Sequence, residues 1–146
     1  MFKLLFISLI TYSSLFSASF FTLDNLGSLK IYTSLKVDYL SVKQKDEIKK
    51  LLHAKLQKAG FSFDNTDPTT FMLKIEAIEV DESQVIYVQI ALGEDVQTLR
   101  KGNIKSFAFT YVANDFIDSE EPYVDTLESI NFLLSEFIEA YKDDNE

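Results

Sequence analysis

Three segments in the middle of the chain, residues 71–80, 84–92 and 104–113, alternate between apolar and mixed positions. Successive side chains of a β-strand point to opposite faces, so this period of two predicts three consecutive strands. Short polar segments separate them, and short connections favour antiparallel pairing. The sequence therefore predicts a three-stranded meander around which the rest of the chain must fold.

The first turn of this meander predicts which residues face one another. With a two-residue loop at residues 82–83, Ala77 lies opposite Val88. One face of the first two strands is then wholly apolar and is expected to face the core: Phe71, Leu73, Ile75, Ala77, Ile86, Val88, Ile90 and Leu92. A register slipped by one residue would place Lys74 and Glu76 against this set, which the pattern disfavours.

The second turn lies within residues 95–103 and leaves two alternatives for the third strand. A loop with an even number of residues places three aromatic side chains on the apolar face: Phe107, Phe109 and Tyr111. Ala108 and Val112 then lie on the mixed face. A loop with an odd number of residues, or a β-bulge, exchanges the two faces.

Two helices and one further strand flank the meander. Residues 28–40 alternate in the manner of a long, half-buried strand. Ser41 and Gln44 have the spacing of a capping box, and Gly60 is suited to end the helix that follows. A second amphipathic helix is expected to begin near Pro122, because proline suits a first helical turn.

The predicted fold is α+β, with the order β-α-β-β-β-α, a four-stranded mixed sheet and both helices packed on one face. The helical crossover after the first strand predicts that this strand pairs in parallel with its neighbour. The single domain is expected over residues 28–142, after a leader at 20–27 and before an acidic tail at 143–146. An acidic connection is expected at residues 114–123.

Residues 1–19 have the composition of a secretory signal peptide. Lys3 is followed by the apolar residues 4–10 and then by a segment rich in small residues. Cleavage after Ser19 and cleavage after Ala18 are the two alternatives. The apolar run is shorter than the roughly 20 residues of a membrane span, so no stable anchor is expected after cleavage. We expect a periplasmic protein of bacterial origin.

Composition excludes several classes of chemistry and partner. The chain has no cysteine, which removes disulfides, thiolate metal sites and lipid attachment through cysteine. The formal net charge is −9, and loss of the signal segment with its single lysine lowers it to −10. An acidic surface disfavours nucleic acid and anionic lipid as partners.

No catalytic, cofactor or metal site is predicted. The single histidine, His53, lies beside the apolar stripe of its helix and is expected to be a surface or boundary residue. Five acidic residues near the C-terminal helix lack the fixed spacing and the glycine of a calcium loop: Asp115, Asp118, Glu120, Glu121 and Asp125. The four glycines are scattered, so no phosphate-binding loop is expected, and we predict that the protein is not an enzyme.

Two features remain that a partner could use. Two helices cannot cover both faces of a sheet, so part of the mixed face is expected to be exposed. This candidate partner surface comprises Tyr32, Met72, Ile78, Val80, Val85, Tyr87, Ala108 and Val112. An unpaired edge strand could also accept a partner's strand, unless lysines such as Lys30 and Lys36 protect that edge.

The first predicted helix ends in Leu56-Gln57-Lys58-Ala59-Gly60-Phe61. Together with the order of elements, this ending resembles a group of small bacterial envelope modules: the lipopolysaccharide-assembly protein of the LptE type, the ABC-transport auxiliary component and the N-terminal domain of TolB. The resemblance is architectural and spans residues 28–142. The first two families are typically lipoproteins, whereas this chain has no cysteine. The resemblance implies a non-catalytic accessory role in the envelope.

The leading functional hypothesis is a periplasmic adaptor that binds a protein partner of the cell envelope. The alternative is a binding protein for a small apolar or lipid ligand, held in a cavity between the helices and the aromatic set Phe107, Phe109 and Tyr111. Neither hypothesis requires a cofactor.

Overall fold

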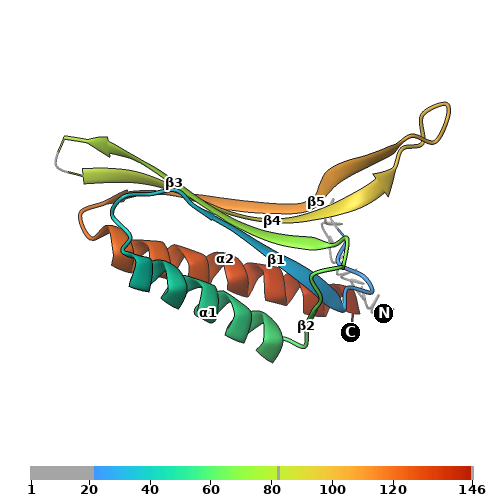
Figure 1. Cartoon of the computed structure of the whole chain (residues 1–146), viewed down its shortest axis with the longest axis horizontal. Coiled ribbons are helices and arrows are strands. Elements are labelled where there is room, and N and C mark those ends of the chain that lie inside the picture. Colours follow the sequence, from blue (N-terminus) through green and yellow to red (C-terminus); the bar gives the residue numbers. More distant parts are fainter. Residues whose placement is uncertain (1–21, 82, 146) are drawn as a thin grey trace, which may run out of the picture.

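The computed structural model describes residues 22–81 and 83–145, so the expected signal segment lies outside the described residues. The elements in chain order are β1 (Ser28–Leu35), α1 (Val42–Lys58), β2 (Ser62–Phe63), β3 (Thr70–Val80), β4 (Ser83–Gln97), β5 (Lys105–Ser119) and α2 (Pro122–Asn145). Figure 1 shows both helices on one side of a single sheet. The predicted α+β class is therefore confirmed.

The sheet has five strands in the order β2-β1-β3-β4-β5, one more than predicted. β1 pairs in parallel with β3, as expected, and in parallel with the additional strand β2. Gly60 has a φ of 103°, and the Phe61 N–H donates to the Leu56 carbonyl at 3.1 Å. This helix ending directs the chain back along β1. A strand of two residues is too short for its periodicity to be recognised.

The first strand ends at Leu35, five residues before the predicted boundary at residue 40. Val37 continues the apolar alternation, and both Val37 and Leu40 are buried, but they lie in the connection to α1. Periodicity alone does not distinguish a strand from a loop whose apolar side chains reach the core. Ser41 then caps α1 as predicted: its side chain accepts from the Gln44 N–H, and the Gln44 side chain accepts from the Ser41 N–H at 2.9 Å.

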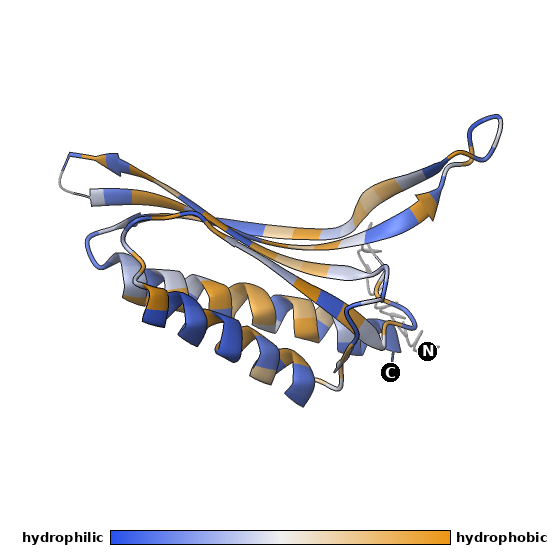
Figure 2. Ribbon diagram, viewed as in Figure 1, coloured by the Kyte–Doolittle hydropathy of each residue, from blue (hydrophilic) through white to orange (hydrophobic). Residues whose placement is uncertain are grey.

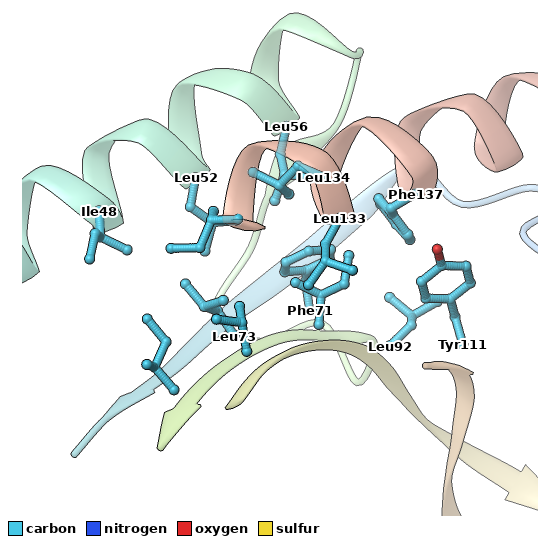
Figure 3. Packing of buried hydrophobic residues seen from close by; sticks show 14 of the residues in the cluster. Ile48, Leu52, Leu56, Phe71, Leu73, Leu92, Tyr111, Leu133, Leu134 and Phe137 are labelled. Atoms are coloured by element: carbon cyan, nitrogen blue, oxygen red, sulfur yellow. The ribbon is translucent and has the colours of Figure 1, made fainter. Parts of the chain in front are cut away.

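The core lies between the helices and the apolar face of β3 and β4, where alternating apolar and polar residues are visible along the strands (Figure 2). The ring of Phe137 from α2 packs against Phe71 at 5.0 Å and against Tyr111 at 5.1 Å between centroids (Figure 3). Leu52 and Leu56 contribute from α1 and are fully buried. The helices thus bury the face that the sequence predicted.

The β3–β4 hairpin confirms the predicted faces and corrects the pairing. Val80 lies opposite Ser83, so the two-residue loop starts at Asp81, one position earlier than expected. Ala77 consequently faces Ile86 rather than Val88. A shift of two residues keeps every side chain on its face. Asp81 has a φ of 54°, which suits the turns favoured in two-residue hairpins.

The β4–β5 pairing combines both alternatives that the sequence left open. Seven residues separate the paired Gln97 and Lys105, and this odd number exchanges the faces next to the turn. Phe107 and Phe109 are therefore 52% and 49% exposed. A bulge opposite Leu92 and Gly93 reverses the exchange, so Tyr111 lies opposite Leu92 and is buried.

Two polar segments belong to regular structure, contrary to expectation. The expected acidic connection at residues 114–123 is largely β5, because ladder hydrogen bonds to β4 override the low strand propensity of its acidic residues. Of the expected acidic tail, residues 143–145 are the last turn of α2. There the Asp144 carboxylate accepts from the Leu23 N–H at 2.7 Å and holds the leader against the helix.

Alanine substitutions at Phe71 and Phe109 should separate the buried from the exposed aromatic positions. Phe71→Ala removes a fully buried ring, so we expect the free energy of unfolding to fall by about 3–5 kcal/mol. Phe109→Ala removes a half-exposed ring, and the expected loss is about 1 kcal/mol or less. Urea denaturation followed by circular dichroism measures both. Equal losses would contradict the bulged register.

Candidate functional site

No helix or strand in residues 22–81 and 83–145 covers the face of the sheet opposite the helices, here called the outer face (Figure 1). The strand register arranges its side chains in rows across the sheet. One row contains Tyr32, Met72, Ala91 and Val112, and another contains Glu76, Tyr87 and Phe116. The outer face is thus a continuous surface built from four strands.

The structure brings seven of the eight predicted partner-surface residues onto this face. Tyr32, Ile78 and Val80 are exposed, and the half-buried members are Met72, Val85, Tyr87 and Val112. Ala108 is the exception. It pairs with Glu94, and the exchange of faces next to the turn places it on the opposite side from Phe107 and Phe109.

A hollow of about 500 Å³ lies on the outer face. Its lining residues are Glu76, Ala77, Ile78, Val85, Tyr87, Asn114 and Phe116. Phe116 is 70% exposed and was missed by the sequence reasoning, which assigned its segment to a connection. The alternation of Val112, Asn114 and Phe116 on one face was the signal that could have found it.

Tyr87 and Phe116 form an aromatic pair within the hollow, with ring centroids 4.8 Å apart and planes tilted by 40°. The Gln89 side-chain amide donates to the Tyr87 hydroxyl at 2.7 Å. Lys74 lies 2.8 Å from the Glu76 carboxylate, and its ammonium lies 5.8 Å from the centre of the Tyr87 ring. These contacts hold Tyr87 in place and pair Gln89, Lys74 and Glu76, while the two aromatic rings form part of the apolar lining of the hollow.

β5 borders the hollow and forms one edge of the sheet. No described strand pairs with the edge of β5 that points away from β4, along any of its 15 residues. Residues 106–114 carry no charged side chain. Lys30 belongs to β1 and Lys36 follows it, so the lysines expected to protect an edge lie elsewhere. The free edge and the aromatic hollow are therefore adjacent, since Phe116 belongs to both.

The possible metal ligands in the sequence, one histidine and several acidic residues, do not come together in the structure. His53 is exposed, as expected, and its ring packs against Phe63 with centroids 3.9 Å apart. Asp115 and Asp118 lie on opposite faces of β5, because they are three residues apart on a strand. Within residues 22–81 and 83–145, no group of three histidine or acidic side chains could hold a metal ion.

The aromatic set expected to line a ligand cavity is also not assembled. Phe107 and Phe109 lie half-exposed on the outer face, with their rings 6.0 Å apart. Tyr111 alone lies in the core, where it packs against Phe137. The predicted cavity needed all three side chains on the core face. That prediction is wrong, because the register of β5 places only Tyr111 there.

No protein-family model matches this sequence, and no curated protein matches it. Among solved structures, the chain is similar to the 2.35 Å crystal structure of a minor lipoprotein from Acinetobacter baumannii, with 9% sequence identity. The similarity covers 77% of this chain and 86% of the lipoprotein, with a TM-score of 0.28. A similarity of this size assigns neither a family nor a function. Neither helix in the described part of the chain is long and apolar enough to cross a membrane.

Two isoleucines of β3 provide a matched test of the uncovered face. Ile75 is fully buried beneath the helices and Ile78 is 64% exposed. We expect Ile75→Ala to lower the free energy of unfolding by about 2–5 kcal/mol. Ile78→Ala should change it by about 0.5 kcal/mol or less. Urea titration of both variants measures the difference, and a large loss at Ile78 would mean that this face is covered.

Proposed function

We propose that this protein is a non-catalytic accessory module of the bacterial cell envelope, and that it binds a protein partner through the outer face of its sheet. The observation that carries the proposal is the aromatic hollow around Tyr87 and Phe116, next to the unpaired edge of β5. The signal-like composition of residues 1–19 supports export to the envelope.

The partner binds by adding a β-strand to β5. The unpaired N–H and C=O groups of an edge strand supply hydrogen bonds to any sequence, whereas pockets beside the edge select the side chains. Here the selecting pocket is the hollow, and alternate apolar side chains of the added strand cover Phe116 and reach Tyr87. The preferred partner therefore presents an extended segment with aliphatic or aromatic residues at alternate positions.

The energetic centre of this contact is the aromatic pair. Large aromatic side chains dominate the binding energy of protein interfaces, and they are most effective when held in place before binding. The hydrogen bond from Gln89 and the neighbouring Lys74 hold Tyr87 in this way. The polar residues Glu76 and Asn114 line the same hollow and are placed to form the rim of the contact.

Photo-crosslinking tests the proposal. A p-benzoylphenylalanine residue replaces Phe116 in one variant of the full chain and Val42, which lies on α1 and is 79% exposed, in the control. In envelope extracts of the source bacterium, we expect one discrete protein adduct from position 116 and none from position 42. Val85→Lys with Tyr87→Lys should lower the adduct yield about tenfold or more, because a buried charge opposes docking.

Two results would count against this function. Equal adducts from positions 116 and 42 would indicate nonspecific contact. An adduct that persists undiminished in the double lysine variant, with circular dichroism showing an intact fold, would exclude the hollow as the binding site.

A further inference from the structure

The end of the β4–β5 hairpin extends beyond the helix layer and curves away from it (Figure 1). Residues 98–107, here called the hairpin tip, connect the two strands and begin β5. Three apolar side chains of this segment are exposed: Leu99 at 102%, Ile104 at 53% and Phe107 at 52%. Scattered exposed apolar residues are common, but three within one protruding segment form an exposed hydrophobic patch.

The same segment carries three basic side chains and no acidic one: Arg100, Lys101 and Lys105. All three are exposed, and within the described part of the chain none forms a salt bridge. The whole chain has a formal charge of −9, and Arg100 is its single arginine. The hairpin tip is therefore a positive, apolar protrusion on an acidic protein.

Backbone hydrogen bonds across the loop stabilise the conformation of the tip. The Thr98 N–H donates to the Ile104 carbonyl and the Asn103 N–H donates to the Arg100 carbonyl, each at 3.0 Å. The Gln97 side-chain amide donates to the Asn103 carbonyl at 3.1 Å. Gly102, with a φ of 95°, makes the tight return possible. Hydrogen bonds within the β4–β5 hairpin thus hold the tip in this conformation.

We propose that the hairpin tip contacts the surface of an anionic phospholipid bilayer. Apolar side chains flanked by Lys and Arg suit the membrane interface, where the apolar groups enter the acyl boundary and the cations meet lipid phosphates. Because the tip protrudes, its apolar side chains can reach the acyl boundary of a bilayer.

The acidic remainder of the protein does not prevent this contact. At physiological salt, exposed charges more than about 8 Å apart are largely screened from one another. Two acidic residues, Glu94 and Asp95, lie at the base of the hairpin. Glu94 accepts a hydrogen bond from Thr110, and Asp95 pairs with Phe107 across the two strands. Repulsion of the acidic body from the bilayer then favours an orientation in which the tip alone approaches. The contact leaves the hollow and the adjacent edge of β5 free, so it stands apart from the proposed partner binding.

A single tryptophan reports on the tip itself, because the natural chain contains none. Leu99→Trp in the full chain is mixed with vesicles of phosphatidylcholine and phosphatidylglycerol, with vesicles of phosphatidylcholine alone, and with polyglutamate. Phe132→Trp on α2, where Phe132 is 59% exposed, is the control. We expect a blue shift and quenching by brominated lipid for position 99 with the anionic vesicles only, and neither for position 132.

Charge removal provides the second measurement. In the Leu99→Trp background, the changes Arg100→Ser, Lys101→Ser and Lys105→Ser together should weaken partitioning into anionic vesicles on the order of a hundredfold, about fivefold for each charge. High salt should weaken it as well. Absence of a shift at position 99, or equal quenching at position 132, would overturn the proposal. A response to polyglutamate as strong as that to vesicles would mean that the tip binds an acidic polypeptide rather than a lipid.

Discussion

Burial of the apolar face of β3 and β4 beneath the two helices is the interaction on which the structure depends. Phe137 of α2 lies at its centre, against Phe71 of β3 and Tyr111 of β5. A fully buried aromatic residue contributes a large share of core stability, since it removes a large apolar area from water. Both helices pack on this face of the sheet. No described element is consequently left to cover the opposite face, and the candidate binding surface follows from the same packing that stabilises the fold.

The β-bulge opposite Leu92 and Gly93 divides the β4–β5 hairpin into two parts with different roles. On one side of the bulge, Tyr111 points into the core. On the other side, Phe107 and Phe109 point outward, and the Phe107 ring lies over Gly93, where any larger side chain would overlap it. A bulge bends its strand and increases the twist. This bend separates the part of the hairpin that belongs to the sheet from the tip that projects beyond it (Figure 1).

The two proposed surfaces differ in shape and charge, and this difference favours different partners. The hollow around Tyr87 and Phe116 is largely apolar, contains the paired Lys74 and Glu76 at its border, and adjoins a free strand edge. Such a site suits an extended polypeptide. The hairpin tip instead protrudes and is basic within an acidic chain. A module that contacts a bilayer at its tip and a protein at its edge would position that protein relative to the membrane surface.

The sequence by itself determined the α+β class, the buried face of β3 and β4, the Ser41 cap and the start of α2 at Pro122, because periodicity and capping act between neighbouring residues. Tertiary structure alone decided the two-residue strand β2 and the bulged register of β5, since both depend on pairing with distant segments. The pairing of β5 with β4 beyond residue 113 carried Phe116 into the hollow, and the bulged register carried Ala108 away from the outer face. A change of one residue in a loop or bulge exchanges the faces of a strand, and local sequence patterns contain no signal for it.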